Sequence, residues 1–228
     1  ALALFARLIK AQGLQLKHRL KAVVSTSETL HPWQRELLAE VFAAPVVNEY
    51  GARDGGIIAY QCPEGGLHLS AENLVAEVSD LLTGELLPAG ERGLLLVTDL
   101  NNFVQPRLRY QLGDEVIISN QLCSCGRTLP LLAEVCGRED DIFVTTDGQF
   151  VHGVAFANCI KRLPEVEAFQ IIQVAPEQAQ VPPGLEGVKA DYQALLPGTK
   201  ISYQLVEAIP PSPSGKTRYA IRQFPLEK

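Results

Sequence analysis

The segment Gly137-Arg138-Glu139-Asp140-Asp141 lies between two apolar stretches, residues 129–135 and 142–144, and divides the chain into two different patterns. A glycine, a guanidinium and three successive carboxylates are hard to bury together, so the segment is expected at a surface or a domain boundary. Its composition also fits a solvated turn between two strands. The change of pattern favours a hinge at 137–141, between a domain of residues 1–136 and one of residues 142–228.

The first 60 residues have the pattern of an α/β unit. Residues 21–24 form a short apolar run, typical of a strand buried in a parallel sheet. A helix is predicted from Pro32, which suits a first turn, to Pro45, which stops it. A second buried strand begins at 46–47, which completes a strand, helix, strand unit.

Polar loops are predicted after both of these strands, at residues 25–29 and 48–56. Loops at the carboxyl ends of parallel strands are where α/β proteins bind ligands. In the second loop three glycines would let the backbone approach a ligand, Tyr50 offers a stacking face, and Asp54 offers a hard oxygen ligand for Mg²⁺. Glycine-rich loops are common, so this motif alone is weakly specific.

Residues 61–136 change to short strands separated by turns, which indicates a small antiparallel sheet or barrel. Asp114 follows Gly113 and is expected at the lip of a strand. A carboxylate in that place could accept hydrogen bonds from the two vicinal hydroxyls of a ribose. An ordinary Gly-Asp hairpin turn fits the local sequence about equally well.

Four soft metal ligands occur in the same region. Cys62 and His68 form a C-x5-H pair, and Cys123 and Cys125 form a C-x-C pair, each beside glycines that allow tight turns. Three thiolates and one imidazole are a tetrahedral Zn²⁺ set that leaves no position for substrate, so we predict a structural zinc site. The alternative is that the cysteines are small buried hydrophobic residues and His68 a surface residue.

Residues 142–228 have the pattern of a compact α+β domain. A hairpin is predicted to turn at Asp147-Gly148, followed by a helix over 154–163, strands at 169–174 and 201–206, and a loop over 176–187. Near the end, prolines and a glycine would present Lys216 on a defined loop, where an ammonium could reach oxyanions. An ordinary exposed lysine is the simpler interpretation of that residue alone.

Composition excludes several classes of function. The formal net charge is −6 and the sequence pI is about 5.3, with basic residues scattered, which argues against a nucleic-acid partner or an anionic membrane surface. No segment approaches the roughly 20 apolar residues of a membrane helix. Five cysteines, an odd number, fit a reducing cytoplasm better than a disulfide framework.

In this order the motifs resemble the carboxyl-terminal part of the adenylate-forming acyl-CoA synthetase superfamily, and most of all its phenylacetate-CoA ligase branch, which includes CapK-type proteins. The resemblance extends along nearly the whole chain. It rests on Ser27-Glu28-Thr29-Leu30, Tyr50-Gly51-Ala52-Arg53-Asp54, Tyr110-Gln111-Leu112-Gly113-Asp114, Cys123-Ser124-Cys125-Gly126-Arg127-Thr128-Leu129-Pro130, Gly137 to Asp141 and the P-S-G-K run that ends at Lys216.

The resemblance implies a ligase that uses ATP, Mg²⁺ and CoA and releases AMP. A carboxylic acid would first form an acyl-adenylate, and a CoA-type thiol would then displace AMP after the small domain rotates as a mobile lid. The resemblance also assigns roles to individual residues. The adenine would be contacted by Ser27, Glu28, Thr29, Tyr50 and Gly51. Asp54 would bind magnesium, Asp114 would bind the ribose, and Arg138 would contact the nucleotide. Asp140 would be the pivot of the hinge, and Lys216 would act in adenylation.

The sequence departs from the family pattern in three places. Asp54 stands where the family has Glu, Gln111 stands where it often has Arg, and no Ser/Thr/Gly-rich phosphate loop ending in Pro-Lys-Gly is present. We therefore expect this chain to be inactive alone and to need an amino-terminal subdomain in cis or in trans. The alternative is a non-catalytic, zinc-stabilised module of CapK-like type that binds a nucleotide or a partner.

Overall fold

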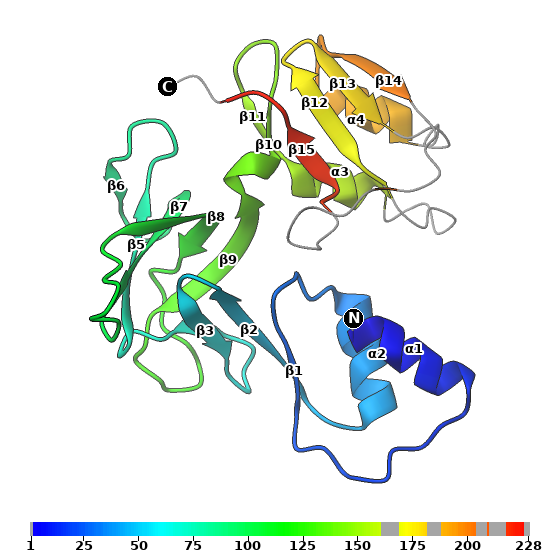
Figure 1. Cartoon of the computed structure of the whole chain (residues 1–228), viewed down its shortest axis with the longest axis vertical. Coiled ribbons are helices and arrows are strands. Elements are labelled where there is room, and N and C mark those ends of the chain that lie inside the picture. Colours follow the sequence, from blue (N-terminus) through cyan, green and yellow to red (C-terminus); the bar gives the residue numbers. More distant parts are fainter. Residues whose placement is uncertain (1, 161–168, 182–187, 204–208, 210–217, 226–228) are drawn as a thin grey trace. The chain divides into compact units, whose positions relative to one another are not determined.

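The computed structural model describes residues 2–160, 169–181, 188–203, 209 and 218–225. The chain forms two compact units, one of Ala1–Leu112 and Val116–Val135, the other of Gly113–Glu115 and Cys136–Lys228. Figure 1 labels the helices and strands of each unit. None of the described helices is both long enough and apolar enough to span a membrane.

Nine strands form one mixed sheet in the order β1-β2-β3-β4-β9-β8-β7-β5-β6. Among the described residues β1 and β6 are its two edges, so the predicted sheet or barrel is an open sheet. The strands are β1 (Val23–Ser25), β2 (Val46–Ala52), β3 (Gly56–Gln61), β4 (Leu67–Leu69), β5 (Leu74–Ser79), β6 (Leu86–Leu87), β7 (Arg92–Asp99), β8 (Tyr110–Ile118) and β9 (Leu131–Arg138).

The predicted strand, helix, strand unit is present at one edge of this sheet. Strand β1 pairs with β2 in parallel, with Val23 opposite Val46, and α2 (Pro32–Phe42) connects them. Pro32 lies in the first turn of α2, and Ala43 ends the helix in the left-handed conformation. Helix α1 (Leu2–Ala11) packs beside α2. The two helices and two strands share a small apolar core of Ala6, Ile9, Val23, Leu38, Phe42, Ala44 and Val46.

The predicted loop at 48–56 is wrong, because β2 continues to Ala52 and turns through residues 53–55 into β3. The glycines serve strand pairing here. A Cβ on Gly51 would lie 2.6 Å from the carbonyl oxygen of Gly56, so the two strands can approach this closely only with glycine at 51. The pairing register shifts between Tyr50 and Gly51, which marks a β-bulge.

The rest of the sheet is built around the antiparallel pairing of β5 with β7, from Leu74 opposite Asp99 to Ser79 opposite Leu94. Alternate side chains of these strands face one apolar core, as expected for a sheet with one buried face. That core contains Ile58, Ala59, Leu69, Leu74, Val78, Leu95, Val97, Val116 and Leu132.

The second unit includes residues 113–115 of β8 and the last three residues of β9. A 3₁₀ turn, η1 (Glu139–Asp141), leads into the hairpin of β10 (Ile142–Val144) and β11 (Phe150–His152), as predicted. Helix α3 (Gly153–Ile160) follows, and a four-stranded sheet has the order β14-β13-β12-β15. Its elements are β12 (Ile171–Ala175), β13 (Gln178–Val181), β14 (Lys200–Tyr203) and β15 (Ala220–Arg222), with α4 (Lys189–Leu195) before β14.

Helices α3 and α4 cover this four-stranded sheet and enclose the core of the second unit (Figure 1). Phe156 packs between Phe143, at 4.9 Å between ring centroids, and Tyr192, at 5.3 Å. The unit is the α+β domain that the sequence predicts. Strand β13 lies inside the predicted loop at 176–187, and α4 and β15 were not predicted.

Candidate nucleotide and metal sites

The two stretches predicted to contact adenine each come shortly after a residue of the β1–β2 pairing. Ser25, the last residue of β1, pairs with Asn48 of β2, and the chain continues from them into residues 26–29 and into Tyr50 and Gly51. Ser27 has a φ of 76°, which is rare for a residue other than glycine, and Glu28 and Thr29 are exposed. The fold therefore brings both stretches to one end of the β1–β2 pair.

Asp54 lies in the turn between β2 and β3 and forms an ion pair with Arg107. The Nη2 of Arg107 donates to Oδ1 of Asp54 at 3.0 Å. The side chain of Asp54 is 48% exposed and that of Arg107 is 18% exposed. This partner could not be predicted from the sequence, because Arg107 lies 53 positions away in an irregular loop. The carboxylate predicted to bind Mg²⁺ thus has a cationic partner from within the chain.

Asp114 was predicted at the lip of a strand, but it lies inside β8. Gly113 before it has a φ of 76°, so the backbone is distorted at this point of the strand. Nη1 of Arg138 donates to Oδ1 of Asp114 at 2.9 Å. A Cβ on Gly113 would lie 3.1 Å from Nη2 of Arg138, so glycine leaves space for the guanidinium. The structure therefore pairs two residues that the motifs assign separately to nucleotide binding.

A buried carboxylate beside Asp114 was missed. Glu115 Oε2 lies 2.9 Å from Nδ1 of His152, and the side chains are only 7% and 18% exposed. Glu115 is on β8 and His152 ends β11, so the contact joins two elements of the second unit. This contact could not be predicted from the sequence, since neither residue lies in a recognisable motif.

The predicted convergence of Asp54, Asp114 and Lys216 on one nucleotide stays a prediction. Asp54 belongs to the first unit and Asp114 to the second. Lys216 and its loop lie outside the described residues, as does the side chain of Asp140. The backbone of Asp140 is within η1.

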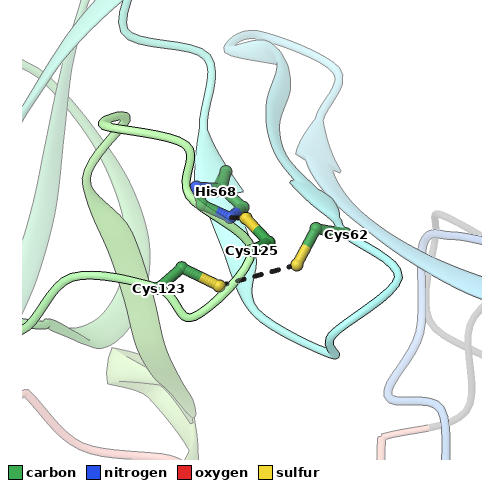
Figure 2. Close-up of side chains that lie close together, drawn as sticks. All are labelled: Cys62, His68, Cys123 and Cys125. Atoms are coloured by element: carbon green, nitrogen blue, oxygen red, sulfur yellow. Dashed lines mark hydrogen bonds between the residues drawn. The ribbon is translucent and has the colours of Figure 1, made fainter.

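The four predicted metal ligands come together within the first unit (Figure 2). The ligand atoms of Cys62, His68, Cys123 and Cys125 all lie within 4.8 Å of one another. The sulfurs of Cys62 and Cys123 are 3.7 Å apart. A tetrahedral Zn²⁺ with Zn–S bonds of about 2.3 Å holds its sulfurs roughly 3.8 Å apart, so the spacing fits this ion.

His68 is held in the tautomer that a metal ligand needs. Its Nδ1 lies 3.2 Å from the carbonyl oxygen of Leu129, which can only accept a hydrogen bond, so Nδ1 carries the proton. The lone pair is then on Nε2, which lies 3.2 Å from the sulfur of Cys125. A carbonyl that orients the second ring nitrogen is the usual support of a metal-bound histidine. His68 is 3% exposed and lies on β4, so it is not the surface residue of the alternative interpretation.

Glycine lets the two ligand loops meet. A Cβ on Gly66 would lie 2.8 Å from Sγ of Cys123 and 3.5 Å from Sγ of Cys62, which is inside the cluster. Gly65 has a φ of 87° and its N–H donates to the carbonyl of Cys62, which closes the first loop. Gly126 closes the second loop with a φ of 81°.

Arg127 supports the cluster from outside, and no role was assigned to it from the sequence. Its backbone N–H, together with its side chain and the neighbouring thiols, lowers the pKa of Cys125 to about 6. Since thiolates are the metal-binding form of cysteine, this environment prepares Cys125 for a cation. The donor set, its spacing and its hydrogen bonds all fit Zn²⁺.

Comparison with known proteins gives the class of the fold. No protein-family model matches the sequence. A crystal structure of 2-hydroxyisobutyryl-CoA ligase in the postadenylation state superposes with a TM-score of 0.70 at 20% identity, over 97% of this chain and 52% of that chain. Apo MatB from Rhodopseudomonas palustris gives a TM-score of 0.52, over 86% of this chain and 44% of that one. The chain has the fold of the carboxyl-terminal part of an adenylate-forming ligase.

Sequence similarity then gives the branch. Phenylacetate-coenzyme A ligase of Thermus thermophilus is 32% identical over 142 residues, which is 59% of this chain and 32% of that protein. Protein CapK of Staphylococcus aureus is 24% identical over 96% of this chain and 50% of that protein. These findings confirm the predicted likeness to the phenylacetate-CoA ligase and CapK-like branch. The chain spans about a third to a half of the length of these relatives.

Proposed function

We propose that this chain is part of an AMP-forming acid-thiol ligase, which joins a small carboxylic acid to a CoA-type thiol through an acyl-adenylate. The observation that carries the proposal is the similarity to phenylacetate-CoA ligase over 142 residues, together with the acyl-CoA ligase fold. The pairing of Asp114 with Arg138 around Gly113 supports it further, because both residues lie in motifs that the resemblance assigns to the nucleotide.

In this proposal each residue keeps the nucleotide-binding role that the resemblance gives it. Tyr50 stacks on adenine at the end of the β1–β2 pair, with residues 27–29 beside it. Asp114 accepts hydrogen bonds from the ribose hydroxyls, and Arg138, which holds that carboxylate at 2.9 Å, orients it. A carboxylate that accepts from two vicinal hydroxyls forms strong, directional hydrogen bonds, so this pair would fix the position of the nucleoside.

Catalysis in the proposal depends on position and charge. ATP and Mg²⁺ would supply the activated phosphate and a cation at its oxygens. Lys216 would lie between the carboxylate of the acid and the α-phosphate, where its ammonium reduces their repulsion. A well-placed donor of this kind contributes about 3 to 4 kcal/mol to a transition state. Rotation of the lid domain of residues 142–228 about residues 137–141 would then withdraw Lys216 and admit the thiol.

The Cys/His cluster is proposed as a structural zinc site. Three thiolates and one imidazole fill a tetrahedral coordination shell, so no position remains for a substrate. The ligands come from two loops that are 55 or more residues apart in the sequence, and a bound ion would join them. Metal analysis of protein purified without added metal is expected to give about one Zn²⁺ per chain.

Activity in this proposal requires a further amino-terminal part, supplied in cis or in trans, with the phosphate loop and most of the acid pocket. The test is pyrophosphate release, with a panel of carboxylic acids, by the longest polypeptide that contains this chain. Lys216→Ala should reduce that rate by a factor of about 100 to 1,000. A longer polypeptide that binds ATP but releases no pyrophosphate with any acid would contradict the proposal.

A direct binding measurement tests the nucleotide site in the 228-residue chain itself. AMP titrated into the zinc-replete chain is expected to bind, and Asp114→Asn is expected to weaken binding about tenfold or more, because a charged hydrogen-bond acceptor is lost. Asp80→Asn is the matched control. Asp80 is an exposed carboxylate that accepts hydrogen bonds from the backbone of residues 82 and 83 in a turn of the first unit.

A second candidate function is a non-catalytic, zinc-stabilised module of CapK-like type. The observation that favours it is that CapK matches 96% of the chain, whereas the phenylacetate-CoA ligase match covers 59%. This module would bind AMP or a protein partner without forming an adenylate. The pyrophosphate assay separates the two functions, since only the ligase releases pyrophosphate in a manner that depends on the acid.

A further inference from the structure

We propose that Arg107 is a positioning residue that competes with a divalent cation for Asp54, so that metal binding at this carboxylate is weakened by an ion pair within the chain. This inference rests on the proposed function in one respect, because the proposed reaction uses Mg²⁺ and the resemblance assigns that ion to Asp54. It adds a residue that neither the motifs nor the comparisons assign.

The geometry places the guanidinium where a cation would lie. Nη2 of Arg107 donates to Oδ1 of Asp54 at 3.0 Å, in the turn between β2 and β3. The arginine is the more buried partner, at 18% exposed against 48% for the aspartate. One oxygen of the carboxylate therefore already interacts with a positive charge, while its side chain remains open to solvent and to an incoming ion.

Arg107 is held in place by its own backbone and by a neighbouring ring. The N–H of Asp99, the last residue of β7, donates to the carbonyl of Arg107 at 3.0 Å and closes the loop between β7 and β8. Pro106 restricts the backbone immediately before it. The guanidinium carbon lies 5.8 Å from the ring centroid of Tyr110, within the range of a cation–π contact. The ion pair thus requires little additional ordering of the arginine.

A metal ion has little else to hold it at this turn. Among the described residues, Asp54 is not part of any group of three or more metal-ligating side chains. Magnesium is usually bound by one or two carboxylates together with substrate phosphates, so a single carboxylate gives a weak site. An ion that binds Asp54 must either displace the guanidinium or share the carboxylate with another positive charge. Removal of that charge should therefore increase the metal affinity.

The test is a titration of the whole, zinc-replete, ¹⁵N-labelled chain with Mn²⁺ alone. Mn²⁺ is a paramagnetic ion that prefers carboxylate ligands and broadens the amide signals of nearby residues. Arg107→Gln should lower the Mn²⁺ concentration that half-broadens the Asp54 and Gly55 signals by about two- to fivefold, the range for a partly exposed ion pair. Arg107→Met, which keeps the apolar stem but not the charge, should give the same shift and replaces the first variant if that one does not fold.

Two control variants make the result specific. Arg109→Gln removes the same charge two residues away, where the arginine binds Glu77 at 2.8 Å instead, and should leave the midpoint unchanged. Asp54→Asn should abolish the broadening at the turn. The proposal is overturned if neither Arg107 variant changes the midpoint, or if Arg109→Gln changes it equally. AMP binding in metal-free buffer is measured separately, so failure of the nucleotide site is distinguishable from failure of this proposal.

Discussion

Gly66 is the single residue on which the Cys/His cluster depends most directly. Any larger side chain would enter the cluster, because its Cβ would lie 2.8 Å from Sγ of Cys123 and 3.1 Å from Cδ2 of Leu131. We expect Gly66→Ala to weaken Zn²⁺ binding by about tenfold or more, as displacement of supporting groups does in other zinc sites. Competition with a chromogenic chelator measures the affinity.

Gly84→Ala is the control for this substitution. Gly84 has a φ of 73° and no heavy atom within 4 Å of an added Cβ, so alanine there introduces backbone strain without touching the metal ligands. Zinc affinity should stay at the wild-type value in this variant. Equal zinc affinity in Gly66→Ala and the wild type would contradict the steric role of Gly66.

Cys125 carries a pH dependence that can be measured in the zinc-free chain. The backbone N–H of Arg127, its side chain and the neighbouring thiols lower the pKa of Cys125 from 9.0 to about 6. Since the lowered pKa belongs to the folded state, the thiolate is present above pH 6 and is lost as the pH falls through that value. Alkylation of Cys125 by iodoacetamide should therefore rise with a midpoint near pH 6 and level off above pH 7.

The alkylation of each cysteine can be followed by mass spectrometry of its peptide. Arg127→Gln removes the cation but keeps the backbone N–H, so the midpoint should rise only part of the way towards 9. A wild-type midpoint near 9 would mean that the loop of residues 123–127 does not hold this conformation without metal.

At the scale of elements, a metal ion bound to the Cys/His cluster would join two loops that the sheet holds only at their ends. Strand β4 has only three residues, Leu67–Leu69, which pair with β3 on one side, and Leu67 and His68 pair with the start of β9 on the other. Such a short strand opens readily unless it is fixed by another interaction. We expect zinc removal by a chelator to increase amide hydrogen exchange in residues 62–69 and 119–132. The long β5–β7 pairing, which lies in the same unit, should keep its protection.

The sequence predicted elements that are encoded locally. The β1-α2-β2 unit was predicted because each strand is a short apolar run and Pro32 and Pro45 mark the ends of the helix. The grouping of the four Cys and His residues could be predicted because cysteine and histidine beside glycines are a common metal-binding pattern. In both cases the signal lies within a few residues of the element or ligand concerned.

The errors occur where distant partners decide the structure. Residues 48–52 have the composition of a loop, but β3 supplies the hydrogen bonds that extend β2 through them. Gly113 suggests a turn before Asp114, but the strand continues through it. Arg107 could not be linked to Asp54, nor Glu115 to His152, because both contacts depend on how separate strands and loops are placed.

At the scale of the whole molecule, the proposed reaction requires the lid domain of residues 142–228 to rotate about residues 137–141. Gly137 has a φ of 144°, a conformation that other residues adopt only with strain, and an added Cβ would meet no heavy atom within 4 Å. The local constraint at this position is therefore conformational and not steric. By contrast, Asp141 is held by Arg218 at 2.5 Å, within the second unit, so movement is expected on the Gly137 side of η1.

Gly137→Ala should consequently affect the two half-reactions differently in the longest polypeptide that contains this chain. Alanine disfavours the observed φ at 137 by about 1 to 3 kcal/mol. It therefore shifts the relative populations of the orientations that the lid domain of residues 142–228 adopts during the reaction. We expect one half-reaction to slow by about tenfold and the other to change little. Pyrophosphate release measures adenylation, and transfer from a preformed acyl-adenylate to CoA measures thioester formation.

Gly148→Ala, at a φ of 83° in the β10–β11 turn, introduces similar strain away from the hinge and should leave the ratio of the two rates unchanged. Equal slowing of both half-reactions by Gly137→Ala would contradict rotation at this glycine, because a change confined to the hinge must favour one orientation over the other.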